Sequence, residues 1–383
     1  MTSTGETTRP GYEIEYRLAR EQFLRLARGI GAEVHSHENS AARGPRGEAL
    51  ATDVVWLGRD DAPRVFLCTS GMHGLEGSAG SAAQCMWLAR FRSLPDDVAV
   101  CLVHALNAWG FAHVARCTEN NVDLNRNFMD FTRALPVNPF YAHVRDVIRL
   151  PALGPETLIS LLAEQQRLTA ELGPARLAYA VNAGQYVDAE GLAYGGLTAE
   201  FGHRVVRDHV LPKIVHARRV GLIDWHTGVG AFGEVAFLPT AGEGTPEWDR
   251  AARWWGRARV AGWKRSSLEA AIEADETESG LTVHKDGQLR FALARLLPHA
   301  EVTGAVIEFG SEREGDLAKL VLVTMYERWL RFVDRGDRHA PSHRAHLERA
   351  LSCFAPEDED WRALVMSEGP RLMDQAIAGL AST

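Results

Sequence analysis

A histidine and a glutamate stand three residues apart in the glycine-bounded turn GMHGLEG, residues 71–77. The apolar run 65–68 before this turn predicts a buried strand, and residues 78–90 after it predict a helix. On such a turn, His73 and Glu76 can point at one spot and supply one nitrogen and one oxygen ligand to a metal ion. A catalytic zinc needs three protein ligands and an open fourth position for water. The pair alone also fits a turn with a surface histidine and a helix-capping glutamate.

The candidate for the third ligand is His226, which lies in a similar setting. It follows an apolar strand-like run and precedes a glycine turn, in the stretch IDWHTG at residues 223–228. In an open α/β sheet, binding sites gather at the carboxyl ends of strands. Two histidines and one glutamate are a ligand set that proteins use for catalytic zinc. The alternative is that His226 only caps a strand.

Hydrolysis at such a zinc needs a base, on another element, that takes the proton of a water molecule. Glu308 is the candidate, because it ends the very apolar run 305–309 just before a glycine. A charged side chain in that position is costly unless it is paired or has a function. The alternative is a glutamate of an edge strand that faces water.

Residues that could bind a substrate cluster in the polar segment 104–128. Arg126 is a fork-shaped donor suited to a carboxylate, and Asn125 beside it can share that anion. Arg116 could polarise a carbonyl or steady an oxyanion. Asp123 could accept a hydrogen bond from the second nitrogen of a ligand imidazole. For each residue, the alternative is an ordinary surface charge or an Asx turn.

The elements that must position these groups alternate between short apolar strands and helices, which indicates an α/β architecture. We expect strands at 54–57, 64–68, 98–103, 220–224, 235–238 and 303–309, and helices over 12–30, 78–90, about 248–263 and 316–333. Residues 36–48 are expected to form a loop. We expect one domain over 1–383, with a disordered start (1–11), a helical insertion (130–218) and a C-terminal helical tail (340–383).

Composition narrows the class of protein. The net charge of -8 argues against nucleic acid or an anionic membrane as the main partner. The five cysteines are scattered without a C-x-x-C pair, and the N-terminus lacks the apolar core of a signal peptide. No apolar run is long enough to span a membrane. We therefore expect a cytoplasmic protein without a membrane partner; whether it forms a homo-oligomer stays open.

Four motifs, in this order, resemble those of the zinc metallocarboxypeptidases: HGLE at 73–76, VDLNRN at 122–127, DWHTG at 224–228 and IEFG at 307–310. That superfamily includes carboxypeptidase A and the succinylglutamate desuccinylase and aspartoacylase branch. The detail looks most like an uncharacterised bacterial branch, in which a stretch like NAWGF at 107–111 leads into the arginine and the N-x-D-L-N-R-N-F block.

The resemblance implies a three-layer α/β/α sandwich around a mixed, mostly parallel sheet. The roles that it implies are Zn²⁺ ligands at His73, Glu76 and His226, with Asp123 behind His73, Glu308 as general base, Asn125 and Arg126 as carboxylate clamp, and Arg116 as carbonyl polariser. The expected activity is therefore hydrolysis of a peptide or N-acyl amide bond next to a free carboxylate in a small substrate.

The chain departs from the metallocarboxypeptidase pattern in three places. Leu75 stands where carboxypeptidase A has an arginine, and residues 130–218 make a long spacer. There is also no tyrosine between Tyr194 and Tyr326, where the carboxypeptidases proper place one over the substrate. A glycine-bounded loop with Tyr186 and Tyr194 could cover the pocket and lend a hydroxyl, or its aromatic rings could only anchor it.

Two other functions stay open. The missing tyrosine favours an N-acyl-amino-acid deacylase over a digestive-type carboxypeptidase, whereas the helical pattern of the tail differs from the C-terminal β domain of the aspartoacylase group. A non-catalytic binding protein on the same fold is the third alternative. Retention of the three ligands together with Glu308 speaks against it, because a binder needs no base.

Overall fold

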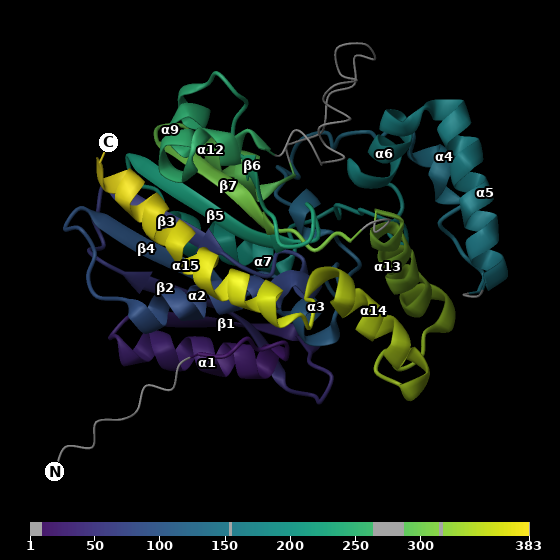
Figure 1. Cartoon of the computed structure of the whole chain (residues 1–383), viewed down its shortest axis with the longest axis horizontal. Helices are drawn as coiled ribbons and strands as arrows, with labels where there is room; N and C mark the ends of the chain where they lie inside the picture. Colours follow the sequence, from purple (N-terminus) through teal and green to yellow (C-terminus); the bar gives the residue numbers. More distant parts are fainter. Residues whose placement is uncertain (1–9, 153–154, 263–286, 314–316, 383) are drawn as a thin grey trace.

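A seven-stranded mixed sheet runs through the centre of the computed structural model (Figure 1). The structure describes residues 10–152, 155–262, 287–313 and 317–382. The strand order is β1-β2-β4-β3-β5-β7-β6. The strands are β1 (Glu33–Arg43), β2 (Ala49–Leu57), β3 (Arg64–Thr69), β4 (Val98–His104), β5 (Arg219–Thr227), β6 (Val235–Pro239) and β7 (Glu301–Phe309).

The centre of the sheet is parallel and its edges are antiparallel. β3 pairs in parallel with β4 and with β5, and β5 pairs in parallel with β7. β1, β2 and β6 run antiparallel to their neighbours. Because Thr69 lies opposite Asp224 in the pairing, β3 and β5 reach the same edge of the sheet together. That edge brings the turn after β3 close to His226.

Helices cover both faces of the sheet and form a group beyond it. The α-helices are α1 (Tyr16–Gly29), α2 (Gly77–Arg90), α3 (Ala108–His113), α4 (Tyr141–Arg145), α5 (Pro155–Leu172), α6 (Pro174–Asn182), α7 (Phe201–Val205), α8 (Leu211–Ile214), α9 (Pro246–Trp255), α10 (Arg257–Val260), α12 (Leu289–Leu296), α13 (Leu317–Trp329), α14 (Arg344–Phe354) and α15 (Glu359–Ser382). Short 3-10 helices are η1 (Gly74–Glu76), η2 (Leu124–Arg126) and η6 (Pro341–His343), and π-helical turns are η3 (Val206–Val210) and η5 (Leu330–Asp334).

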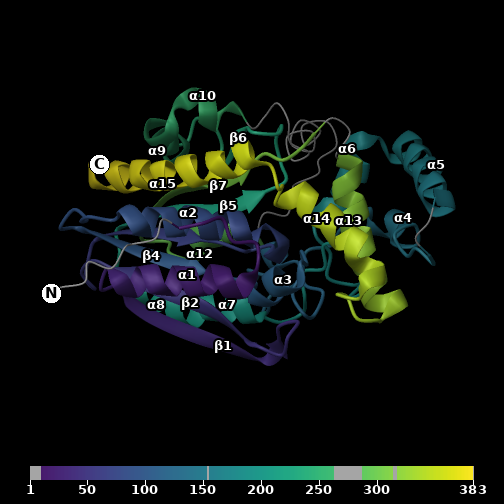
Figure 2. The ribbon, with the colours of Figure 1, turned by 60° about the horizontal axis from the view of Figure 1, so that its bottom comes forward.

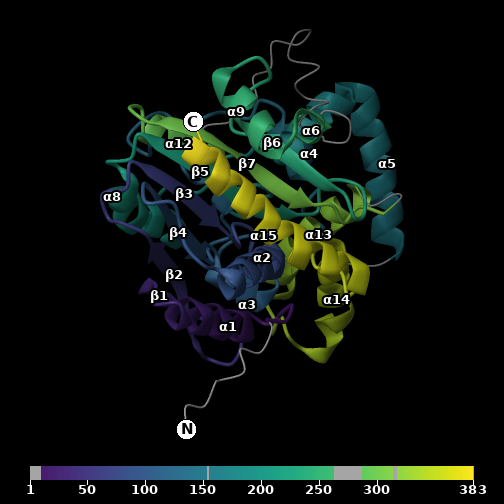
Figure 3. The same cartoon turned by 60° about the vertical axis from the view of Figure 1, so that its left-hand side comes forward.

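Two apolar layers make the sandwich. Side chains of α1, α2, α9 and α15 pack with one face of the sheet, and α15 crosses the front of the sheet in Figures 1 and 3. Side chains of α7, η3, α8 and α12 pack with the other face. The central strands are therefore buried on both sides, as their apolar runs predicted. This arrangement confirms the predicted α/β/α sandwich with a mixed sheet.

A third apolar cluster joins α4, α5, α6 and α13, from Tyr141 and Leu168 to Met325. Figures 1 and 2 show these helices and α14 gathered at one end of the molecule, beside the sheet. Most of the segment expected as a helical insertion lies here, whereas α7, η3 and α8 return to the sheet. No helix among the described residues combines the length and apolar character needed to cross a bilayer.

The expectation of a loop at 36–48 is wrong, because most of that segment belongs to β1, which extends to Arg43. β1 is an edge strand with mainly exposed side chains, so its polar composition hid it from a search for apolar runs. The helix expected over 248–263 ends at Trp255, and Gly256 with φ of 95° separates α9 from α10. Trp263 and most of the expected disordered start lie outside the described residues.

Candidate metal centre

The turn that carries the first two candidate ligands depends on glycine at two positions. Gly71 has φ of 67°, which L side chains rarely adopt, and a Cβ there would lie 2.7 Å from Ala105 Cβ. At Gly74, a Cβ would lie 2.0 Å from the carbonyl carbon of Gly110 in α3. The chain can therefore turn tightly after β3 and press against α3, which directs His73 and Glu76 inward.

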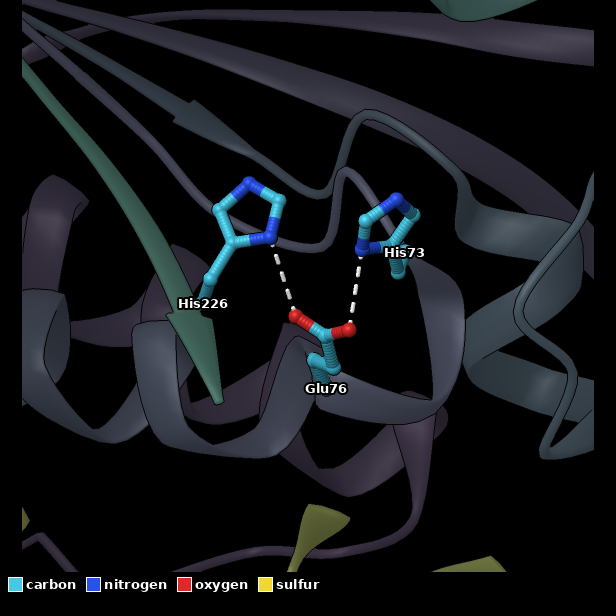
Figure 4. Close-up of side chains that lie close together, drawn as sticks. All are labelled: His73, Glu76 and His226. Atoms are coloured by element: carbon cyan, nitrogen blue, oxygen red, sulfur yellow. Dashed lines mark hydrogen bonds and ion pairs between the residues drawn. The ribbon is translucent and has the colours of Figure 1, made fainter. Parts of the chain in front are cut away.

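His73, Glu76 and His226 meet at the carboxyl edge of the sheet (Figure 4). The Nδ1 atom of His73 is 2.9 Å from Glu76 Oε1, and the Nδ1 atom of His226 is 3.0 Å from Glu76 Oε2. One ligand atom of each residue lies within 4.8 Å of the others, and all three residues are buried. In the described part of the chain, this is the one such group of three or more side chains.

The Nε2 atom of each imidazole contacts a second carboxylate. His73 Nε2 is 3.2 Å from Asp123 Oδ1, and His226 Nε2 is 3.0 Å from Asp224 Oδ2. An Nε2–H that donates to a carboxylate fixes the ring and leaves the Nδ1 lone pair for a metal. Asp224 accepts a further hydrogen bond from Thr69 Oγ1 at 2.6 Å.

Sequence reasoning assigned no role to Asp224, although it lies in the DWHTG motif. Its position two residues before His226 was the available signal, because residues i and i+2 of a strand point to the same face. Asp123, by contrast, lies where the resemblance implied it, next to His73.

The charges in this cluster suit a divalent metal. Burial alone would raise the pKa of Glu76, but the neighbouring His73 and His226 outweigh it and hold the pKa far below its usual range. Burial would lower the pKa of His226, yet Asp224 and Glu76 raise it well above the ordinary value. An anionic oxygen between two imidazole nitrogens is a donor set that fits Zn²⁺, and it resembles the ligands of zinc carboxypeptidases.

Glu308 is placed beside this group by the sheet itself. In the parallel pairing of β5 with β7, Glu308 lies opposite His226. Its side chain is buried, and Oε2 is 3.5 Å from the amide nitrogen of Val229. Burial raises the pKa of the Glu308 carboxyl well above its usual range; His226 opposes this and Glu76 adds to it. A buried carboxyl with few hydrogen-bond donors is suited to accept and release protons.

Arg116 lies next to Glu76 and Asp123. Its Nη1 atom is 3.5 Å from Glu76 Oε1, and its Nη2 atom is 3.3 Å from Asp123 Oδ2. Hydrogen bonds of this length are weak, so the guanidinium lies close to the candidate ligands without being fixed by them. A positive charge therefore lies near the candidate metal position, beside Glu76 and Asp123.

Arg126 and Asn125 are close to this region, but Arg126 already binds the backbone. Its Nε and Nη2 atoms donate to Asn182 O at 3.1 and 2.6 Å, and Nη1 donates to Asn125 O at 2.8 Å. A guanidinium has five N–H donors, so these three bonds leave further N–H groups that could bind a ligand. Asn125 Oδ1 is buried without a hydrogen-bond partner.

A cavity of about 50 Å³ opens next to Arg116, Asp123 and Arg126. Its other walls come from the end of α6, from residues 191–193 and from α13. A wider depression of about 590 Å³ lies near Pro63 and Arg218, at the amino ends of β3 and β5. Since the ligand group is at the opposite ends of these strands, the small cavity is the relevant one.

The loop that carries Tyr186 and Tyr194 is bonded to the segment that carries Asp123 and Arg126. The Tyr186 hydroxyl donates to Arg126 O at 2.6 Å, and the amide of Asp123 donates to Tyr194 O at 2.7 Å. The Tyr186 hydroxyl is thus engaged with the backbone and does not stand over the metal group. For Tyr186, this favours the anchoring interpretation over that of a cover that supplies a hydroxyl.

A sequence profile of the family described as "Protein of unknown function (DUF2817)" matches residues 12–368. No curated protein matches the chain in sequence. The profile covers the four motifs, the metal group and α13. Its description names no activity.

Solved structures with similar folds include the following three. A protein from Shewanella amazonensis SB2B, provisionally called a metallopeptidase, has 14% identity and a TM-score of 0.44, with 90% of this chain and 95% of that chain covered. Bovine thrombin-activatable fibrinolysis inhibitor, in complex with tick carboxypeptidase inhibitor, has 11% identity and a TM-score of 0.41, with 94% and 98% covered.

The third structure is from Shewanella frigidimarina NCIMB 400 and is provisionally called a succinylglutamate desuccinylase/aspartoacylase. It has 17% identity and a TM-score of 0.31, with 80% of this chain and 72% of that chain covered. At TM-scores this low, the likeness carries no argument about activity, which rests on the side chains described above.

Proposed function

This chain belongs to the family described as "Protein of unknown function (DUF2817)", and we propose that it is a zinc-dependent hydrolase that cleaves an amide bond next to a free carboxylate. One observation carries the proposal. Both imidazoles direct Nδ1 to Glu76 and Nε2 to an outer carboxylate, and the buried Glu308 lies beside His226. A histidine with a purely structural role does not need a carboxylate at each of its two ring nitrogen atoms.

His73, Glu76 and His226 would hold the zinc ion. When bound, zinc would lower the pKa of a water molecule and polarise the carbonyl of the substrate. Asp123 and Asp224 would keep the two imidazoles in the tautomer that exposes Nδ1. Because these five side chains are buried, the site can hold its geometry without reorganising.

Glu308 would accept the proton of the attacking water and then give it to the leaving amine. Arg116 would stabilise the negative charge that develops on the carbonyl oxygen. The remaining N–H groups of Arg126, with Asn125, would hold the substrate carboxylate and so fix which amide bond lies at the metal group. Small peptides and N-acyl amino acids both carry such a carboxylate.

An N-acyl-amino-acid deacylase is the second candidate. The engagement of the Tyr186 hydroxyl with Arg126 O favours it, because this hydroxyl is then not offered to the substrate as the tyrosine of the carboxypeptidases proper is. Against it, α15 packs along the sheet where the aspartoacylase group continues into a β domain. A pure binding protein is disfavoured, because burying the Glu308 carboxylate costs free energy that binding alone does not require.

A substrate screen in the presence and absence of a chelator tests the proposal. Dipeptides and N-acyl amino acids, each as free acid and as amide, are incubated with the purified protein. We expect hydrolysis of free acids of at least one class, loss of activity with the chelator and recovery on addition of zinc. Cleavage of amidated and free-acid substrates at equal rates would show that the substrate does not need a free carboxylate. Chelator-insensitive activity would refute zinc chemistry.

A further inference from the structure

The carboxylate of Glu327 in α13 holds the backbone that carries Arg116. Its Oε2 accepts the amide N–H of Arg116 at 2.7 Å, and its Oε1 accepts the amide N–H of Cys117 at 3.3 Å. Arg331, one helical turn later, lies 3.4 Å from Oε1. Glu327 is only 4% exposed, so its charge is buried and depends on these donors.

The same backbone segment is bonded to the metal-ligand turn. The amide of Gly74 donates to Arg116 O at 3.3 Å, and the amide of Leu75 donates to Ala115 O at 2.9 Å. Gly74 and Leu75 are the two residues between His73 and Glu76. Hydrogen bonds thus connect α13, through residues 115–117, to the turn that holds two of the three candidate ligands.

Glu327 also lines the small cavity together with Arg116 and Thr324. The helix that holds the Arg116 backbone is therefore also a wall of the space where a substrate would lie. Within the described part of the chain, the Arg116 side chain has long ion pairs, at 3.3 Å to Asp123 and 3.5 Å to Glu76. Its position consequently depends strongly on the backbone from which it extends.

We propose that Glu327 is a positioning residue that sets Arg116 for the reaction; this rests on the proposed function, in which Arg116 stabilises the developing oxyanion. The effect is geometric, since Glu327 acts through the amides of residues 116 and 117. A displacement of about 1 Å at a reacting centre can lower the rate on the order of a hundredfold.

A carboxylate is suited to this task and a carboxamide is not. Glutamate offers two acceptor oxygens, one for each amide N–H, whereas glutamine has one acceptor and an NH₂ group that would face an N–H donor. Glu327→Gln keeps size and shape but should release one end of the 116–117 segment. The exposed Glu348→Gln on α14 makes the same chemical change at a solvent-facing position and serves as control.

A double-mutant cycle with Arg116→Gln separates positioning from general stabilisation. Turnover and KM of wild type, Glu327→Gln, Arg116→Gln and the double variant are measured on the best substrate of the screen, with zinc content and melting temperature. We expect Glu327→Gln to lower kcat by roughly ten- to a hundred-fold with a smaller change in KM and with zinc retained. In the Arg116→Gln background, the same change should cost almost nothing more. Glu348→Gln should match wild type.

Equal loss of kcat from Glu327→Gln in both backgrounds would overturn the positioning role while leaving the hydrolase proposal intact. Absence of any hydrolysis by zinc-loaded wild type would instead overturn the proposed function and the role with it. If Glu327→Gln does not fold, Glu327→Asp replaces it in the cycle, because the shorter side chain keeps the charge but cannot span both amides. Equal loss of kcat from Glu327→Asp in both backgrounds would then overturn the positioning role, and absence of hydrolysis by zinc-loaded wild type would overturn the proposed function.

Discussion

At the residue scale, the candidate metal centre depends on imidazole rings that contact a carboxylate through each of their two nitrogen atoms. His226 has Nδ1 near Glu76 and Nε2 near Asp224, so its orientation is fixed by two carboxylates. The candidate ligand residues could be selected from the sequence, because His and Glu at fixed spacing after apolar strands are visible there. Asp224 was missed although its spacing of two residues from His226 was visible, whereas Glu327 left no local signal, because the fold alone brings α13 to residues 116 and 117.

Asp224→Asn should weaken zinc binding roughly 10- to 100-fold. The amide is nearly isosteric but no longer offers a full negative charge to His226 Nε2–H, and it can present an NH₂ group instead. A competition titration against a chromophoric chelator measures the affinity. Asp60→Asn, at an exposed position, is the matched control. Equal zinc affinities of the Asp224 variant and wild type would show that Asp224 does not contribute to zinc binding.

Glu308→Gln should lose most turnover, on the order of a hundred- to ten-thousand-fold, and keep both metal and fold. The amide has the size of the carboxyl but cannot accept a proton from water. Turnover on the best substrate, zinc content and circular dichroism are compared with those of wild type. Loss of zinc along with activity would mean that Glu308 is a ligand or a structural group.

At the element scale, the turn after β3 and α3 fit together through Gly74. A methyl group there would meet the backbone of Gly110 and Phe111 at 2.0 to 2.3 Å, and backbone cannot move aside as a flexible side chain can. Gly74→Ala should therefore destabilise the protein by about 1–3 kcal/mol, in the range of overpacked interiors, or displace the ligand turn.

Urea unfolding and zinc content of Gly74→Ala test this contact. Gly29→Ala is the control, since a Cβ at Gly29 would meet nothing within 4 Å and its φ is not positive. The control should be as stable as wild type or slightly more stable. A Gly74→Ala variant with wild-type stability and full zinc content would show that the turn and α3 are not packed as described.

The sequence predicted the buried strands well, because β3, β4, β5 and β7 are apolar runs covered on both faces. It failed for β1, whose polar residues form an exposed edge strand. Composition carries little signal when a strand is stabilised mainly by backbone pairing with one neighbour. The break between α9 and α10 was likewise missed, although Gly256 marks it.

At the scale of the whole molecule, stability should depend on acid conditions through buried neutral histidines. His104 at the end of β4 stacks on Phe23 of α1 at 4.5 Å between ring centroids, and its Nε2 is 2.9 Å from Ser81 Oγ of α2. Burial lowers the pKa of His104 to about 4; Asp53 opposes this shift and Arg20 adds slightly to it. The folded protein therefore resists protonation of this ring.

The free energy of unfolding should fall as the pH drops from about 6.5 to about 4, because the unfolded chain binds the proton first. A pKa lowered from 6.5 to about 4 corresponds to roughly 3 kcal/mol over that range. In His104→Gln, which does not titrate, the decline should be shallower by a comparable amount. Parallel curves of unfolding free energy against pH for both proteins would contradict this.

The general architecture followed from the alternation of strands and helices, but the grouping of helices beside the sheet did not. α13 joins α4, α5 and α6 in one apolar cluster although well over a hundred residues of chain separate them. Such a contact leaves no local pattern, so the role of α13 as a wall of the cavity emerged only from the structure.

The most direct test of the central claim is the metal content of the purified protein and of two ligand variants. Elemental analysis should find about one zinc per chain in wild type, because one set of three ligands is present. His73→Ala and His226→Ala should each remove most of it while circular dichroism shows a folded protein. Unchanged metal content in both folded variants, or a zinc-free wild type after incubation with zinc, would contradict the assignment of this site.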